Sequence, residues 1–138
     1  NSRQGDSDSL MPDLENKHIL LVEDNQINLM IALEILQATK AKIDTAEDGK
    51  QAVKAFEDSE PGYYDIIFMD IQMPVMDGYE AASLIRASNR PDGKTVPIYA
   101  MTANTFAEDI AKARSSGMNG HIAKPIDINN VMQVLRHL

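Results

Sequence analysis

The sequence contains no cysteine, which excludes a disulfide framework and any metal centre built on thiolates. It also has no long apolar run near its start, where the stretch 19–22 is far too short to cross a bilayer. The polar opening NSRQGDSDSLMPDLENK lacks the hydrophobic segment of a signal peptide. We therefore expect a cytoplasmic domain with no direct membrane contact, and leave open whether it belongs to a membrane-tethered parent protein.

Basic residues are scarce, with 13 lysines and arginines against 21 aspartates and glutamates. The net charge of −8 makes the surface as a whole repel nucleic acids and anionic lipids, so we expect no nucleic acid partner. An acidic domain that handles phosphate needs local positive charge from a cation, a lysine or the N-terminus of a helix. Any phosphate site in this chain must therefore include one of these positive groups.

The length of 138 residues suits one domain, which at this size buries roughly two-thirds of the surface that its unfolded chain exposes. Residues 1–16 are polar and lack hydrophobic periodicity, so we predict a flexible linker or tag remnant there. The pattern changes at Lys17. Residues 17–138 are therefore predicted to form the folded domain.

Short apolar runs recur along residues 17–138, with helical patterns between them. The predicted strands are 18–22, 42–46, 66–69, 97–101 and 121–123. Helices are predicted from Asp24 or Asn25 to about 41, after a turn at Asp48-Gly49, from Gly78 to about 88, from about 105 to 114, and from about Ile128 to the end. Alternating strands and helices indicate βαβ units. The fold class is therefore α/β, a doubly wound five-stranded parallel sheet of the (βα)5 type.

Two local features of these helices are predicted as well. The first helix turns one face inward, and the members of that face are Asn28, Ile31, Ala32, Ile35, Leu36 and Thr39. Residues 89–93, Asn-Arg-Pro-Asp-Gly, are predicted to form a loop after the third helix.

Chemistry-bearing residues stand at the carboxyl ends of four predicted strands. In a doubly wound sheet, ligands bind beyond these ends, at the point where the strand order reverses. The first strand is followed by Glu23 and Asp24, the third by Asp70, the fourth by Thr102 and the fifth by Lys124. With strand order 2-1-3-4-5, the reversal lies between the first and third strands. Glu23, Asp24 and Asp70 are therefore predicted to surround one crevice.

Three clustered carboxylates predict a cation site. Two unit charges about 4 Å apart repel by about 4 kcal/mol at an effective dielectric constant of about 20, so the cluster is costly without compensation. Oxygen ligands suit Mg²⁺ or Mn²⁺, and the lack of cysteine and of histidine near these strand ends argues against zinc or copper. We expect Mg²⁺, with Mn²⁺ as the alternative, because Mg²⁺ keeps coordination positions for phosphate oxygens.

Each of these residues also has a purely structural interpretation. Glu23 and Asp24 can cap the following helix, and Asp70 can simply form a turn. Thr102 can be a helix cap, and Lys124 an ordinary solvated residue. The combination favours chemistry, because Thr102 supplies a hydroxyl donor and Lys124 a positive charge for a phosphoryl group carried by Asp70.

Four segments carry a resemblance to a known family. They read Leu-Leu-Val-Glu-Asp-Asn at 20–25, Met-Asp-Ile-Gln-Met-Pro-Val-Met-Asp-Gly at 69–78, Ala-Met-Thr-Ala at 100–103 and Ala-Lys-Pro at 123–125. In this order they resemble the receiver domain of two-component response regulators, over residues 17–138, and look most like receivers fused to hybrid sensor histidine kinases. The strand order 2-1-3-4-5 is flavodoxin-like.

The resemblance implies a phosphorelay function for the matching residues. Asp70 would attack a phosphohistidine of a histidine kinase or of a histidine phosphotransfer domain, and these are the expected partners. Thr102 would move to bind the phosphoryl group, and Lys124 would pair with it. The surface formed by the fourth helix, the fifth strand and the fifth helix would then change and be recognised by a partner. The domain would support its own phosphoryl transfer and slow dephosphorylation without being an enzyme otherwise.

The resemblance also implies a ligand set for Mg²⁺. Asp24 would bind the ion directly together with Asp70, and Glu23 would help to hold it through water. The backbone carbonyl of Gln72 would be a further ligand. A cis peptide bond between Lys124 and Pro125 is predicted in addition, because proline lowers the cost of the cis form to roughly 0.5–1 kcal/mol.

The chain departs from the family pattern at His121. Many receivers have tyrosine or phenylalanine at this position, three residues before the lysine, as a rotating switch. Alternation along the strand places His121 on the face opposite Lys124, toward the fourth helix. The imidazole carries hydrogen-bonding nitrogens and can swing between exposed and inward rotamers, so His121 is a second switch candidate beside Thr102. The alternative is a partly exposed strand residue that contacts the partner and does not switch.

Other functions fit the sequence less well. Phosphatases that resemble the haloacid dehalogenases also form an aspartyl phosphate, but they need a second aspartate where this chain has Gln72. A dinucleotide-binding fold needs a glycine-rich loop after the first strand, and none follows it here. A degenerate receiver that serves only as an interaction module is disfavoured by the intact set of site residues.

Overall fold

The computed structural model of the protein describes residues 13–103, 107–124 and 126–136. Within them, parallel strands pair in the order β2-β1-β3-β4-β5, which confirms the predicted fold class. The strands are β1 His18–Val22, β2 Lys42–Ala46, β3 Ile66–Asp70, β4 Ile98–Thr102 and β5 Gly120–Ala123. The helices are α2 Gln26–Gln37, α3 Gly49–Asp58, α4 Gly78–Arg86, α5 Asp92–Thr95, α6 Ala107–Ser115 and α7 Ile128–Leu135.

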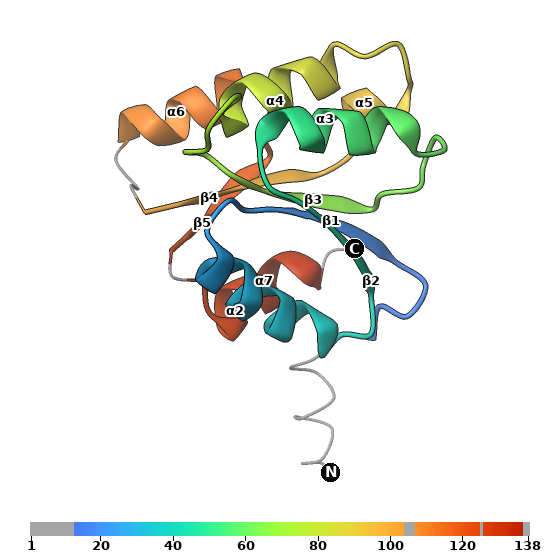
Figure 1. Ribbon diagram of the computed structural model, residues 1–138, viewed down its shortest axis with the longest axis vertical. Coiled ribbons are helices and arrows are strands. Elements are labelled where there is room, and N and C mark those ends of the chain that lie inside the picture. Colours follow the sequence, from blue (N-terminus) through green and yellow to red (C-terminus); the bar gives the residue numbers. More distant parts are fainter. Residues whose placement is uncertain (1–12, 104–106, 125, 137–138) are drawn as a thin grey trace.

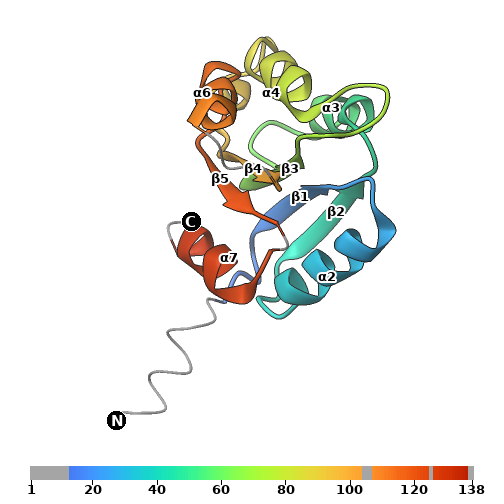
Figure 2. The ribbon, with the colours of Figure 1, turned by 90° about the vertical axis from the view of Figure 1, so that its left-hand side faces the viewer.

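The helices cover both faces of the sheet, with α2 and α7 below it and α3, α4 and α6 above it (Figure 1). Figure 2 shows the same layers from the side, with β2 and β5 at the two edges. Because successive side chains of a strand point to opposite faces of the sheet, each face carries its own hydrophobic cluster. On β3, for example, Ile67 and Met69 join the cluster under α3 and α4, whereas Ile66 and Phe68 join the cluster over α2 and α7.

The central strands β1 and β3 are the most deeply buried elements of the molecule. Residues 19–22 of β1 and 66–69 of β3 are at most 2% exposed. Each large aliphatic or aromatic side chain buried in this way stabilises the fold by about 1.5–3 kcal/mol. The carboxyl ends of β1 and β3 are therefore held firmly side by side, and this fixes the residues that follow them.

The first helix is shorter than predicted, and its inward face matches the prediction except at Ile31. Helix α2 ends at Gln37 rather than near residue 41. The Thr39 hydroxyl donates to the carbonyl of Leu36 at 2.6 Å, and Lys40 has a φ of 69°, so the chain leaves the helical path here. Ile31, predicted inward, is 40% exposed, and the buried positions are Leu29, Ala32 and Leu36.

The segment predicted as a loop at 89–93 contains the start of an additional short helix, α5. Arg90 organises it: the guanidinium forms an ion pair with Asp92 at 2.8 Å and donates to the carbonyl of Ser59 at 2.7 Å. It also lies 4.5 Å from the centre of the Phe56 ring. Long-range contacts of one arginine therefore order a segment that local sequence predicts to be irregular.

Two predictions concern the ends of the chain and of its helices. Residues 13–16 of the predicted linker are described, and Leu14 among them is buried and donates its N–H to the carbonyl of Thr39 at 2.8 Å. Packing therefore begins before the predicted boundary at Lys17. Residues 1–12 and 105, the predicted start of the fourth helix, lie outside the described residues. None of the helices formed by the described residues is long and apolar enough to span a membrane.

Candidate functional site

The carboxyl ends of β1, β3, β4 and β5 meet around one cleft of about 230 Å³. Parallel strands end at the same edge of a sheet, so residues far apart in the sequence converge there. The described residues that line the cleft are Glu23, Asp24, Asn25, Asn28, Asp70, Ile71, Gln72, Thr102, Ala103 and Lys124. The strand-end residues predicted to share a crevice are thus brought together.

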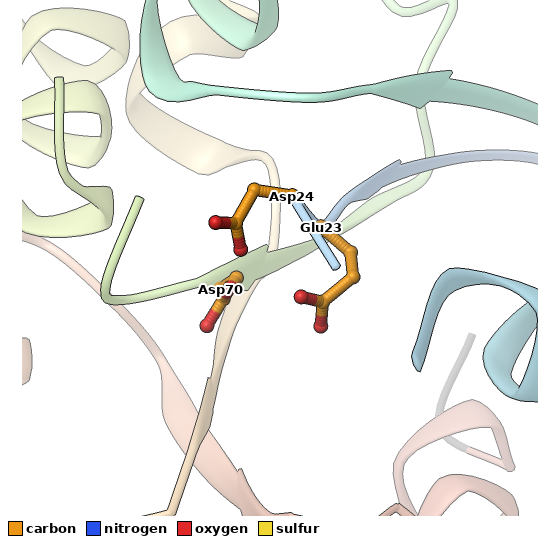
Figure 3. A group of neighbouring side chains, drawn as sticks. All are labelled: Glu23, Asp24 and Asp70. Carbon is orange, nitrogen blue, oxygen red and sulfur yellow. The ribbon is translucent and has the colours of Figure 1, made fainter. Parts of the chain in front are cut away.

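Three carboxylates form the acidic part of the cleft. One oxygen atom from each of Glu23, Asp24 and Asp70 lies within 4.8 Å of the other two (Figure 3). Glu23 is 2% exposed and Asp70 is 4% exposed, whereas Asp24 is exposed to solvent. Two of the three acids are therefore held where water solvates them poorly.

Lys124 compensates part of this charge. Its Nζ lies 2.8 Å from Oδ1 of Asp70 and 2.9 Å from Oε1 of Glu23. The second oxygen of Glu23 accepts the N–H of Asn25 at 3.1 Å, so the glutamate is fixed from both sides. The backbone of Lys124 is fixed as well, because its N–H donates to the carbonyl of Thr102 at 2.9 Å.

Helix capping does not account for the acid pair. The N-cap of α2 is Asn25, whose Oδ1 accepts the N–H of Asn28 at 3.0 Å. Glu23 instead bridges Lys124 and the backbone of Asn25, and the carboxylate of Asp24 faces the space beside Asp70 (Figure 3). The structural alternative to a cation site therefore fails for Asp24.

The electrostatics of the cleft are dominated by burial. Desolvation is the main reason why the pKa of Asp70 is raised to about 7, and the nearby charge of Glu23 raises it further. The hydrogen bond from Lys124 acts in the opposite direction and lowers this pKa. Burial lowers the pKa of Lys124, but the hydrogen bonds and charges of Asp70 and Glu23 outweigh it and leave that pKa raised. The carboxylates thus hold more negative charge than the lysine neutralises.

These donors fit a hard divalent cation. When all groups are ionised, three carboxylates and one ammonium leave an excess of negative charge, which a dication neutralises. The carboxylates offer only oxygen atoms as metal ligands, and no histidine is among the described residues that line the cleft. This donor chemistry suits Mg²⁺ and disfavours zinc or copper.

The loop after β3 is folded back tightly beside the cleft. A Cβ on Gly78 would lie 2.3 Å from the carbonyl oxygen of Asp70, so only glycine fits this close approach. The N–H of Met76 donates to the carbonyl of Pro74 at 2.7 Å around Val75, whose φ is 68°. This is a classic γ-turn, which is strained at a β-branched residue. Gln72, two residues before Pro74, lines the cleft.

Comparison with known proteins identifies the family. The model of the response regulator receiver domain matches residues 19–136. The chain belongs to the response regulator receiver domain family. Receiver domains of this family act in two-component phosphorelays, and the relatives of this one include hybrid histidine kinases.

Two curated relatives illustrate the size of the proteins that contain such receivers. This receiver is 36% identical over 118 residues to the peroxide stress-activated histidine kinase of Schizosaccharomyces pombe, and the match covers 85% of this chain and 7% of that kinase. It is 34% identical over 154 residues to the probable histidine kinase 1 of Oryza sativa subsp. indica, covering 91% of this chain and 16% of that protein. The receiver therefore spans a small part of these relatives.

Two solved structures resemble the receiver closely. One is the receiver domain of a sensor histidine kinase from Pseudomonas aeruginosa with a magnesium ion coordinated in its active site cleft. It is 37% identical with a TM-score of 0.78, over 88% of this chain and 95% of that one. The other is the receiver domain of a Saccharomyces cerevisiae response regulator in complex with its histidine phosphotransfer protein. It is 32% identical with a TM-score of 0.71, over 89% of this chain and 92% of that one.

Within this receiver, Thr102 lines both the cleft and a hollow beside α4 and α6. The residue is half-buried at the end of β4, and it also lines a hollow that includes Tyr79 of α4 and Lys112 of α6. Ala103, next in the chain, is exposed at the cleft and presents only a methyl group. Thr102 therefore lies between the cleft and the helices α4 and α6.

His121 lies outside the cleft of the receiver. It is exposed on the edge strand β5 and lines a small hollow with Thr102, Tyr79 and Ile110 of α6. This is the face toward the predicted fourth helix, as strand alternation indicated. Pro125 lies outside the described residues, so the predicted cis peptide bond is not described.

Sequence reasoning did not assign Asn28 to the cleft of the receiver. Its side chain lines the cleft from the first turn of α2, where the sequence predicted only an inward-facing helix position. The sequence contained an indication that Asn28 lies at the cleft. Asn28 stands three residues after the capping Asn25 and therefore on the same side of the first turn.

Proposed function

We propose that Asp70 is the phosphoacceptor of this receiver and takes the phosphoryl group from a phosphohistidine of a histidine kinase or histidine phosphotransfer protein. The observation that carries the proposal is the contact of Lys124 with Oδ1 of Asp70 at 2.8 Å in a cleft with two further carboxylates. One oxygen of Asp70 is thereby held, and the other is available for attack. The receiver family and its phosphorelay function support the same role.

Mg²⁺ is the proposed cofactor. Asp24 and Asp70 would hold the ion directly, Glu23 would hold it through water, and the backbone carbonyl of Gln72 would complete the protein ligands. When bound, the ion neutralises charge that develops on the phosphoryl oxygens during transfer. The magnesium ion in the cleft of the related Pseudomonas aeruginosa receiver supports this assignment.

The residues of the chain perform the transfer mainly by positioning. An oxygen of Asp70 forms a bond to phosphorus while the bond from phosphorus to the histidine nitrogen breaks, and the electron pair of that bond stays on the imidazole. Lys124 pairs with one phosphoryl oxygen and Thr102 donates its hydroxyl to another. Hydrolysis of the resulting acyl phosphate by water returns Asp70 slowly to the free carboxylate.

Phosphorylation is proposed to change the surface formed by α6, β5 and α7. Thr102 lines both the cleft and the hollow beside α6, so its movement toward a phosphoryl group would alter that hollow. His121 lines the adjoining hollow with Ile110 of α6, and is the second switch residue in this proposal. The phosphoryl group biases a two-state equilibrium of this surface.

The partner is proposed to dock beside the cleft on α2. This helix exposes three large apolar side chains within three residues of the cleft-lining Asn28, with Ile27 70%, Met30 67% and Ile31 40% exposed. Such a patch on an otherwise acidic domain is typical of a protein interface. The occupant would be a histidine phosphotransfer protein, as in the related yeast complex.

Labelling with a small phosphodonor tests the proposal. Acetyl phosphate and Mg²⁺ should add one hydroxylamine-sensitive phosphoryl group to the wild type, measured by intact-protein mass spectrometry. Asp70→Asn should abolish labelling, whereas Asp58→Asn, a change in an exposed acid outside the cleft, should not. Full labelling of the Asp70→Asn variant would refute the assignment, and an unlabelled wild type would indicate a degenerate receiver.

A further inference from the structure

We infer that Asn28 is a positioning residue for Lys124: once Asp70 is phosphorylated, the side-chain oxygen of Asn28 accepts an N–H of the lysine ammonium. The inference rests on the proposed phosphoacceptor function of Asp70. It concerns how Lys124 is held on the phosphoryl group after the lysine has lost its contact with the free carboxylate of Asp70.

The ammonium of Lys124 has one more hydrogen-bond donor than its two carboxylate partners use. A lysine ammonium has three N–H donors. In the cleft, Nζ of Lys124 contacts Oδ1 of Asp70 at 2.8 Å and Oε1 of Glu23 at 2.9 Å. The lysine side chain is only 17% exposed, so little solvent is available for the third donor. A buried donor without a partner is costly, and this favours an acceptor nearby.

Lys124 has a second set of neighbours on the side of α2. Lys124 also lines a second hollow between α2 and the segment before α7, where its apolar neighbours include Ile31, Met101 and Ile126. Among the described residues of this hollow, the polar neighbours of the lysine are Glu23 and Asn28. Glu23 is already paired, so Asn28 is the acceptor that this side offers.

The side chain of Asn28 has hydrogen-bonding capacity that no other described residue uses. It is half-buried and lines both the cleft and the second hollow, as Lys124 does. Its backbone N–H donates to Asn25, which fixes the turn, but its side-chain amide has no hydrogen bond to another residue in the described part of the chain. A half-buried amide with open bonding capacity beside a lysine is placed to bind it once the lysine moves.

Phosphorylation supplies that movement. When Asp70 carries a phosphoryl group, Lys124 pairs with a phosphoryl oxygen and must shift to reach it. Glu23 moves little with the lysine, because its second carboxylate oxygen accepts the backbone N–H of Asn25 at 3.1 Å. An acceptor on α2 then holds the ammonium in its new position. Asn28 therefore acts through Lys124 and not on phosphorus.

A double-mutant cycle tests this inference, because coupled residues give non-additive effects. Asn28→Leu keeps the approximate volume of the side chain and removes its hydrogen bonding. With acetyl phosphate and Mg²⁺, it should slow labelling by about fivefold, the effect of one net hydrogen bond. In the Lys124→Ala background, the same change should have no effect. Asn28→Asp, which restores an oxygen acceptor, should label near the wild-type rate.

Controls separate positioning from damage to the fold. Gln26→Leu introduces the same side chain at an exposed position of the same helical turn and should leave labelling unchanged. Mg²⁺ affinity, measured by calorimetry, should be the same in Asn28→Leu and wild type. If Asn28→Leu does not fold, Asn28→Ala takes its place in the cycle.

The outcomes distinguish this inference from the proposed function. An equal loss with and without Lys124, or no loss in either background, would overturn the role of Asn28 while labelling of Asp70 stands. A wild type that is not labelled at all would overturn the phosphoacceptor function instead.

Discussion

The ammonium nitrogen of Lys124 lies 2.8 Å from Oδ1 of Asp70, across the sheet from the end of β5 to the end of β3. The two residues are 54 positions apart in the sequence. Their contact joins the proposed nucleophile to the positive charge of the cleft, and it bears on the chemistry, the stability and the metal affinity of the domain.

Loss of the lysine charge is expected to slow phosphorylation far more than metal binding. We predict that Lys124→Ala lowers the rate of labelling by acetyl phosphate about 100-fold, because a preorganised charge that stabilises the phosphoryl oxygens is lost. Mg²⁺ affinity should not fall, since the lysine is no ligand and repels the cation. Calorimetry and mass spectrometry measure the two effects. A large loss of Mg²⁺ affinity would place Lys124 in the metal site.

The raised pKa of Asp70 predicts that Asp70→Asn stabilises the metal-free protein at alkaline pH. The folded-state pKa of about 7 exceeds the ordinary value of 3.8, so the folded state binds the extra proton between these values. The wild type therefore loses stability as pH rises from 3.8 to about 7, and the loss levels off above the folded-state pKa. The variant lacks this loss and should be more stable at pH 8 by on the order of 2 kcal/mol, with a smaller difference near pH 5.

Thermal unfolding in a chelating buffer measures this difference. Saturating Mg²⁺ should reverse it, because only the wild type has the complete site and gains stability from binding. Asp58→Asn, in an exposed ion pair with Lys54, is the control and should show no such pH dependence. A variant that is less stable than the wild type at pH 8 without metal would contradict the prediction.

Mg²⁺ binding is predicted to weaken as pH falls below about 7. The ion displaces the proton that Asp70 holds in the metal-free state, and the pKa of about 7 sets the pH at which this competition begins. Affinity should fall by up to about tenfold per pH unit below that point. Calorimetric titrations at pH 8, 7 and 6 give the slope, and equal affinities at all three would exclude Asp70 as a ligand.

The strained turn at Val75 predicts a stabilising glycine substitution. Val75 has a φ of 68° and its side chain is 77% exposed, so glycine relieves the strain and loses little packing. We expect Val75→Gly to raise the free energy of unfolding by about 0.5–1 kcal/mol, the strain relief less the entropy of glycine. Urea unfolding measures it. Glu34→Gly within α2 is the matched control and should destabilise by about 1 kcal/mol.

His121 is predicted to affect recognition and not chemistry. It is exposed on β5 and is not among the residues that line the cleft. His121→Ala should therefore leave labelling by acetyl phosphate nearly unchanged and alter the rate of transfer from a phosphorylated histidine phosphotransfer protein. Comparing the two donors separates the steps. An equal loss with both would place His121 in the chemistry, and no loss with either would leave it an ordinary surface residue.

Much of the fold follows from local sequence. The strands β1 and β2 were predicted with the bounds that the structure has, because a short apolar run between turn residues is typical of a β-strand. Local sequence missed the early end of α2 and the helix α5. In both places side chains bind distant or backbone partners, as Thr39 does with Leu36 and Arg90 with Ser59. Periodicity does not encode such contacts.

The sequence by itself determined which residues stand at the strand ends, and therefore that Glu23, Asp24, Asp70, Thr102 and Lys124 gather at one edge of the sheet, because the ends of parallel strands coincide. The tertiary structure alone decided how they are used. Burial of Asp70 raises its pKa, the bridge of Lys124 to Glu23 sets the direction of the ammonium, and Asn28 joins the site from α2. Desolvation and hydrogen bonding depend on neighbours in space, which the order of residues along the chain does not state.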